Sequence, residues 1–189
     1  MTRRLAAIAC GGIALCVVGL WLTRPAAPPF DAVRAAHGPS DARLLDRHGV
    51  VLDARRIDST RRRLDWVPLD TIAPALRRAV VAVEDRRFTE HGGVDLRAVA
   101  AALGQAIRGG PSRGASTISM QLAALLDPRL RPHGGARSLA QKWGQVRLAR
   151  ALERAWSKDQ ILEAYLNLVG FRGELEGVGA AAAALFATA

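Results

Sequence analysis

The sequence predicts a mainly helical protein with a short N-terminal β-hairpin and one transmembrane helix. Residues 5–22 form an 18-residue stretch without a charge, which at ~1.5 Å per helical residue covers most of a ~30 Å hydrocarbon core. Apolar and polar residues alternate over residues 43–57 around a His-Gly pair, a pattern typical of a hairpin. From Pro68 onward the apolar residues recur at the helical period.

The apolar stretch 5–22 is expected to be an uncleaved signal-anchor. Arg3 and Arg4 precede it, so the positive-inside rule places residues 1–4 in the cytoplasm and the residues after Arg24 outside. A cleaved signal peptide is the competing interpretation, but residues 23–29 contain no clean small-x-small cleavage site. Both cysteines lie inside the apolar stretch. The exported part therefore depends on a packed core for its stability.

The composition is that of one globular domain. Of the 189 residues, 50% are hydrophobic and 23% are charged, which argues against disorder. The net charge of +10 is carried almost wholly by arginine and favours anionic partners such as nucleic acid, anionic lipid or pyrophosphate. No nucleic-acid partner is expected, because the anchor would export the domain away from cytoplasmic nucleic acid.

The first half of the exported part is expected to contain a linker, the hairpin and three helices. The prolines within residues 23–40 predict an irregular linker. Residues 73–83 are expected to form a buried helix that delivers Glu84 at its C-terminal end, and residues 96–107 a second helix. Ser116 has the position of an N-cap for a third helix that extends to Leu126.

Two further helices are expected after residue 136. The fourth spans residues 137–156 and carries one apolar stripe, which consists of Leu139, Trp143, Val146, Ala149 and Trp156. Ser157 and Gln160 form a capping box that opens the fifth helix. One face of that helix, typical of core packing, carries Ile161, Leu162, Tyr165, Leu166 and Val169.

Five short segments follow one another in a specific order along the chain. They are residues 84–88 (Glu-Asp-Arg-Arg-Phe) with His-Gly-Gly at 91–93, residues 114–122, residues 137–142, residues 158–167 and residues 173–181. In this order and at these separations they resemble the motif set of the peptidoglycan glycosyltransferases, glycosyltransferase family 51, over residues 41–189. The Ser-Met-Gln sequence at 119–121 resembles the 1C type of class A penicillin-binding protein.

This resemblance implies a lysozyme-like helical glycosyltransferase lobe on the periplasmic side of the bacterial inner membrane. It implies that residues 41–189 are a glycosyltransferase domain truncated at its C-terminus, since family domains continue past the last motif. The implied reaction polymerises lipid II into β-1,4-linked glycan strands by inverting displacement of an undecaprenyl pyrophosphate leaving group. The implied partners are lipid II, the growing glycan strand, the cytoplasmic membrane and other cell-wall synthesis proteins.

Glu84 is the candidate catalytic base. It follows the apolar run at residues 80–83, and low-polarity surroundings would raise the pKa of its carboxyl towards the working pH. An ordinary carboxylate at a helix end is the alternative for Glu84 taken alone. By the resemblance, Asp85, Phe88 and His91 belong to the substrate-binding set, although Asp85 alone would also suit a turn cap and His91 a loop that closes a helix.

The remaining candidates would bind the substrate and its leaving group. Arg137 and Lys142 match family positions that face the pyrophosphate, where their charge would stabilise the departing group. Ser116, Thr117 and Gln121 lie at a predicted helix start, where hydroxyls and backbone N–H groups favour anions. Glycines at 173, 177 and 179 suggest close helix approach rather than a phosphate loop. Residues 94–112 resemble the membrane-facing jaw of the family.

The chain departs from the family pattern at three positions. Gln141 stands where relatives have arginine, Gln145 stands where they have glutamate, and Ala124 stands where many have lysine. Gln145 keeps hydrogen bonding but discards charge. A divalent cation, Mg²⁺ or Mn²⁺, could supply the missing charge, yet the spacing identifies no cluster of metal ligands.

These departures leave two other functions open. One is a non-catalytic relative that binds lipid II or acts as a scaffold for cell-wall synthesis. The other is a glycan-cleaving lytic enzyme, which the lysozyme-like lobe would also suit and which would release anhydro-sugars from purified wall.

Overall fold

A computed structural model describes residues 25–108, 116–132 and 138–186. The predicted anchor at residues 5–22 and Arg137 lie outside the described residues. Within the described part no helix combines the length and apolar character needed to cross a bilayer.

The elements up to residue 63 comprise a helix, a hairpin and a short strand. Helix α2 (Phe30–Ala35) is followed by strands β1 (Asp41–Leu45) and β2 (Val51–Arg56), which pair antiparallel. The turn between them uses Gly49 at φ +82°, a conformation that favours glycine. Strand β3 (Arg62–Arg63) pairs in parallel with the later strand β4 (Leu175–Glu176). The predicted hairpin is confirmed.

The irregular linker predicted over residues 23–40 is interrupted by a short helix within its described part. Residues 30–35 are helical, and the segment lies against the body of the protein rather than hanging from it. Phe30 contacts Trp66 and Trp156 edge-to-face, with ring centroids 6.1 and 5.3 Å apart. The Trp156 Nε1–H donates to the Pro28 carbonyl at 2.9 Å. Burial of aromatic surface outweighs the weak helix-forming tendency of a proline-rich segment here.

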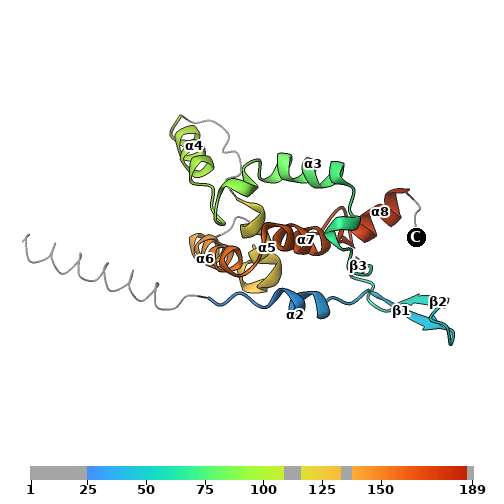
Figure 1. The fold of residues 1–189 in the computed structure, drawn as a ribbon. Helices are drawn as coiled ribbons and strands as arrows, with labels where there is room; N and C mark the ends of the chain where they lie inside the picture. Colours follow the sequence, from blue (N-terminus) through green and yellow to red (C-terminus); the bar gives the residue numbers. More distant parts are fainter. Residues whose placement is uncertain (1–24, 109–115, 133–137, 187–189) are drawn as a thin grey trace, which may run out of the picture.

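The helical part begins with 3₁₀ turn η1 (Leu69–Thr71) and helix α3 (Pro74–Glu84). It continues through η2 (Phe88–Glu90), α4 (Leu96–Ile107), α5 (Ile118–Leu126), η3 (Pro128–Leu130), α6 (Leu139–Ala155), α7 (Lys158–Leu168) and α8 (Val178–Phe186). Figure 1 shows α5, α6 and α7 gathered at the centre, α3 and α4 above them, and the hairpin projecting at the end opposite α4. Mainly helical architecture with small sheets agrees with the predicted lysozyme-like lobe.

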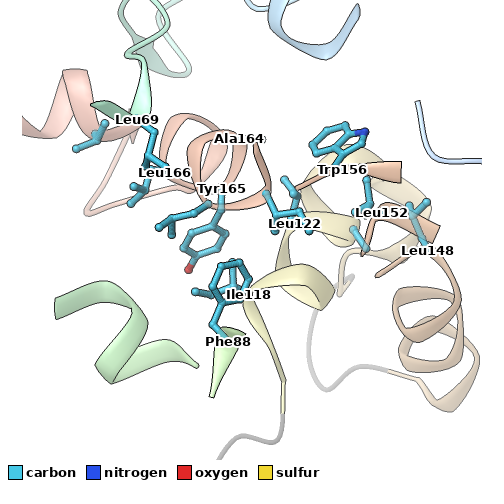
Figure 2. Packing of buried hydrophobic residues seen from close by; sticks show 14 of the residues in the cluster. Leu69, Phe88, Ile118, Leu122, Leu148, Leu152, Trp156, Ala164, Tyr165 and Leu166 are labelled. Atoms are coloured by element: carbon cyan, nitrogen blue, oxygen red, sulfur yellow. The ribbon is translucent and has the colours of Figure 1, made fainter. Parts of the chain in front are cut away.

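The core is built around α5 and α7. Helix α5 contacts both α6 and α7, and its residues Ile118 and Leu122 have no exposed surface. Figure 2 shows Ile118, Leu122 and Leu166 within this cluster, with Leu166 beside Leu69. The predicted core face of α7 is confirmed, with Ile161, Leu162, Tyr165 and Leu166 buried. Full burial of such side chains contributes ~1.5–3 kcal/mol each.

The apolar stripe predicted for the fourth helix is wrong in its first half. Leu139 is 88% exposed and Trp143 is 51% exposed. The buried face of α6 instead consists of Gln145, Leu148, Ala149, Ala151 and Leu152. Packing rather than periodicity therefore decides which residues of α6 are covered. The capping boxes at Ser138–Gln141 and Ser157–Gln160 are both present, the second as predicted.

Candidate active site

Glu84 is the last residue of α3 and is exposed. The expectation of a buried helix is wrong, because α3 has no buried residue and Val83 is 81% exposed. Only Val80 and Val81 pack, partly buried, against the core. The carboxylate of Glu84 is therefore accessible to a substrate, but the expected shielding from water is not provided by α3.

Glu84 is positioned by a chain of hydrogen bonds that begins in the core. Gln121 Nε2 donates to Glu84 Oε2 at 2.9 Å, and the Tyr165 hydroxyl donates to Gln121 Oε1 at 3.1 Å. Burial, together with the negative charge of Glu84, raises the pKa of Tyr165 to about 12. Tyr165 thus remains a proton donor over the whole physiological range and fixes the orientation of the Gln121 amide.

Sequence reasoning found Gln121 but missed Tyr165 as a site residue. The helical period identified Tyr165 as a core residue, and it is buried. Figure 2 shows its ring within the cluster and its hydroxyl at the edge, on the side where Ile118 and Phe88 lie. The available signal was chemical: a tyrosine on a core face carries a hydroxyl that needs a partner.

Two pockets meet at this hydrogen-bond chain. The α3–α4 pocket, about 630 Å³, is lined by Glu84, Arg86, Ser116 and Thr117 among others. The α5–α7 pocket, about 490 Å³, is lined by Gln121, Arg131 and Tyr165 among others. Because Gln121 lines one pocket and Glu84 the other, their hydrogen bond joins the walls of both. A reacting hydroxyl at Glu84 would have space on either side.

Asp85 and His91 hold the loop that follows α3. Asp85 is 6% exposed, and its Oδ2 accepts from the Ile118 backbone N–H at 3.0 Å. His91 Nε2 lies 2.9 and 3.0 Å from the two Asp85 carboxylate oxygens, and the Gly93 N–H donates to His91 Nδ1 at 3.2 Å. These contacts tie the end of α3 to the start of α5. These contacts suit both residues for positioning Glu84; Asp85 also lines the α3–α4 pocket, and the predicted contacts of Asp85 and His91 with the substrate stay a prediction.

The same loop is held from α6 and α7. The Lys158 ammonium donates to the His91 carbonyl at 2.7 Å and to Glu153 at 2.8 Å, and lies 4.5 Å from the centre of the Phe88 ring. Phe88 is 2% exposed and belongs to the core. This burial shows that Phe88 anchors the loop after α3, and its predicted contact with the substrate stays a prediction.

The loop is closed by an ion pair at the start of α4. Arg87 donates to both carboxylate oxygens of Asp95 at 3.0 Å. Burial alone would raise the pKa of Asp95, but hydrogen bonds from the Ala98 backbone N–H and from Arg87 hold it below its usual value.

The start of α5 is capped by Thr117 rather than by Ser116. The Thr117 hydroxyl accepts from the Met120 N–H at 3.2 Å and donates to the Gly93 carbonyl at 2.7 Å. The predicted cap is thus one residue too early, because the helix begins at Ile118. Thr117 is buried, while the half-buried Ser116 lines the α3–α4 pocket beside Glu84.

The expected cationic side of the site is only partly described. Lys142 is exposed on α6 and lines neither pocket beside Glu84. Arg131 does line the α5–α7 pocket, where its guanidinium donates to the carbonyls of Ala124 and Leu125. Sequence reasoning missed Arg131, which has no distinctive spacing.

The three residues that depart from the family pattern lie on α5 and α6. Gln145 is 1% exposed, its Nε2 donates to the Leu130 carbonyl at 2.8 Å, and its Oε1 has no partner within the described part of the chain. Ala124 lines the α5–α7 pocket, and Gln141 caps α6. Gln145 therefore ties η3 to α6 and also lines the α5–α7 pocket. Within the described ranges no group of three or more potential metal ligands is present.

The predicted close approach at the glycines is confirmed at two of three positions. A Cβ at Gly177, which has φ +84°, would lie 2.6 Å from the Asn167 carbonyl oxygen. At Gly179 it would lie 3.2 Å from Val67 Cγ2. Gly173 has φ +66° but no neighbour within 4 Å, so it serves a turn.

Comparison with known proteins agrees with this arrangement. The family model described as transglycosylase matches residues 49–189. A biosynthetic peptidoglycan transglycosylase from Rhodospirillum centenum is 38% identical over 189 residues, 96% of this chain and 69% of the relative. Proteins of the same name from Pseudomonas syringae pv. syringae and Aeromonas hydrophila are 40% identical over 136 residues and 41% identical over 118 residues. These matches cover 72% and 62% of this chain.

The chain therefore belongs to the transglycosylase family of peptidoglycan glycosyltransferases. It spans 54% and 48% of the lengths of the Pseudomonas and Aeromonas relatives. The family resemblance indicated by the five motifs is confirmed, and the relationship to the 1C type stays a prediction.

Proposed function

We propose that this chain polymerises lipid II into β-1,4-linked glycan strands, with Glu84 as the general base. Family membership supports glycan polymerisation in general. The observation that carries the assignment to Glu84 is its accessible carboxylate, fixed through Gln121 at the junction of two pockets. The identity of the donor and of the leaving group rests on the motif resemblance.

The geometry of Glu84 suits proton abstraction. Its Oε2 accepts from Gln121, while its Oε1 has no hydrogen-bond partner among the described residues. One oxygen is thus held and the other is free to accept the proton of a sugar hydroxyl. Because Asp85 and Tyr165 hold the two elements that carry this pair, the carboxylate needs little reorganisation before reaction.

In the proposed step, Glu84 takes the proton from the 4-hydroxyl of the acceptor GlcNAc. The hydroxyl oxygen then attacks C1 of the terminal sugar of the growing strand. The bond from C1 to the pyrophosphate oxygen breaks, the electron pair leaves with undecaprenyl pyrophosphate, and the configuration at C1 inverts.

The leaving pyrophosphate requires positive charge. Lys142 and Arg137 are proposed for this role on their match to family positions, and a Mg²⁺ or Mn²⁺ ion is a further candidate. Arg131 is a cation that already faces the α5–α7 pocket. Two backbone carbonyls hold its guanidinium, and no ion pair joins it to an acid among the described residues.

The proposed location is the inner membrane of a bacterium, with a single anchor at residues 5–22 and the catalytic part on the periplasmic side. The charge pattern around the apolar stretch supports this orientation. Leu96 and Val99 on α4 are exposed apolar residues of the proposed membrane-facing jaw.

A non-catalytic scaffold is the second candidate. Gln145 favours it, because this residue lines the α5–α7 pocket with an uncharged amide where relatives have a glutamate. Such a protein would bind lipid II without joining it.

Polymer formation from labelled lipid II separates the two candidates. The full chain in detergent is expected to form polymer, and Glu84→Gln is expected to reduce the rate by a factor of about 10² to 10⁴. The matched control is Glu90→Gln, since Glu90 is an exposed carboxylate at the far end of the same loop. Equal, background-level signals from the wild type and Glu84→Gln would favour the scaffold. Release of anhydro-sugars from purified wall would instead indicate a lytic enzyme.

A further inference from the structure

A third pocket lies on α3 away from Glu84. This α3–α7 pocket has a volume of about 450 Å³ and is bordered by Arg77 and Arg78 of α3, by Arg86, and by Lys158 and Asp159 of α7. Neither Glu84 nor Gln121 lines it. The pocket shares Ala82 and Arg86 with the α3–α4 pocket but does not include the proposed base or its partner.

The floor of the α3–α7 pocket is apolar. Leu69, Phe88 and Leu162 line it, and all three belong to the core cluster. Val81, partly buried on α3, adds to the same surface. The pocket thus reaches the outer side of the hydrophobic core, where a short hydrocarbon segment would remove apolar surface from water.

The rim of the pocket carries uncompensated positive charge. The guanidinium groups of Arg77, Arg78 and Arg86 make no hydrogen bond or ion pair with any described residue, in contrast to that of the neighbouring Arg87, which is paired with Asp95. The Lys158 ammonium is already taken by Glu153 and the His91 carbonyl. Asp159 is an acid on the rim and offsets part of this charge. Three guanidinium groups against one carboxylate leave a net preference for an anion.

We propose that the α3–α7 pocket binds a phosphate group joined to an apolar chain, as in the headgroup region of an anionic lipid. Guanidinium groups bind phosphate oxygens through paired, charge-assisted hydrogen bonds. The first carbons of the chain would lie on Leu69, Phe88 and Leu162. A free phosphate would satisfy the arginines but leave this floor uncovered.

Calorimetric titration of the full chain in an uncharged detergent tests this site. The probes are dihexanoylphosphatidylglycerol and inorganic phosphate. The double variant Arg77→Gln/Arg78→Gln should bind the lipid at least about tenfold more weakly than the wild type, since each arginine near an anionic lipid contributes about fivefold. The matched control is Arg150→Gln/Arg154→Gln, which removes the same charge from exposed positions on α6 and should change binding less than about twofold.

Three results would overturn the proposal. They are no lipid binding by the wild type, equal losses in the two double variants, and inorganic phosphate binding as tightly as the lipid. Thermal midpoints matching the wild type show that the variants are folded. Glu84→Gln should bind the lipid like the wild type, so failure of the proposed polymerase function and failure of this site are distinguishable.

Discussion

The two sides of the candidate active site differ in how they are held. Gln121 and Tyr165 come from α5 and α7, which form the buried centre of the protein. Glu84 comes from α3, which has no buried residue and exposes Val83. The comparison shows that the proposed base is carried by a thinly packed helix and placed by contacts from the core. Stability and activity should therefore respond to different substitutions.

The largest effect on stability is expected at Leu122. Leu122→Ala removes a side chain with no exposed surface and should lower the free energy of unfolding by about 2–5 kcal/mol. Val83→Ala, on the exposed α3, should change it by less than about 0.5 kcal/mol. Urea unfolding followed by circular dichroism measures both. Similar values for the two variants would show that α3 packs as tightly as α5.

Gly177 offers the next largest effect. Gly177→Ala combines a left-handed backbone with a Cβ at 2.6 Å from the Asn167 carbonyl oxygen, and should cost more than about 2 kcal/mol. Gly173→Ala shares the positive φ but meets no neighbour, so about 1 kcal/mol is expected. Thermal unfolding compares the pair. A smaller loss for Gly177→Ala than for Gly173→Ala would contradict the close approach to α7.

Asp85 links the two sides of the site, so its substitution should affect both the free energy of unfolding and the rate of polymerisation. Asp85→Asn weakens the contacts with His91 and the Ile118 N–H, so a loss of about 1–3 kcal/mol in unfolding free energy is expected together with slower polymerisation. Glu84→Gln should slow polymerisation at unchanged stability, because Glu84 is exposed. An Asp85→Asn protein with full activity and reduced stability would show that the loop does not position Glu84.

The titration of Tyr165 is expected to have the smallest effect on stability. Its absorbance change is the most specific measurement, since Tyr165 is the only tyrosine in the chain. Its pKa, raised to about 12 by burial and by the charge of Glu84, favours the protonated hydroxyl in the folded state. This contribution to stability is fully present below the ordinary pKa of 10.0 and is lost as the pH rises towards 12. Absorbance of tyrosinate at alkaline pH reports the titration directly.

Glu84→Gln provides the matched test of that coupling. Removing the negative charge should move the native titration midpoint of Tyr165 below that of the wild type. Identical midpoints would show that the charge of Glu84 does not affect the pKa of Tyr165. The proposed base would then not be electrostatically coupled to the buried side of the site.

The most accurate predictions from the sequence concern the helices whose bounds are set by local signals. The helix at 96–107 has the predicted bounds, and the Ser157–Gln160 capping box begins α7 where expected. Such signals act within one turn, between neighbours that the chain itself places together. The cap of α5 was displaced by one residue because Ser116 and Thr117 have the same capping chemistry, and only the contact of Thr117 with the Gly93 carbonyl distinguishes them.

The sequence by itself determined the family, the helical class and the identity of Glu84 as the candidate base. These depend on residue types in order along the chain. Only the tertiary structure decided that α3 is exposed and that Phe88 and Gln145 are buried. It also decided that α2 packs on the body of the protein and that Tyr165 holds Gln121 against Glu84. Periodicity identifies an apolar face, but burial depends on whether another element covers that face, and contacts between residues far apart in sequence exist only once the helices have assembled.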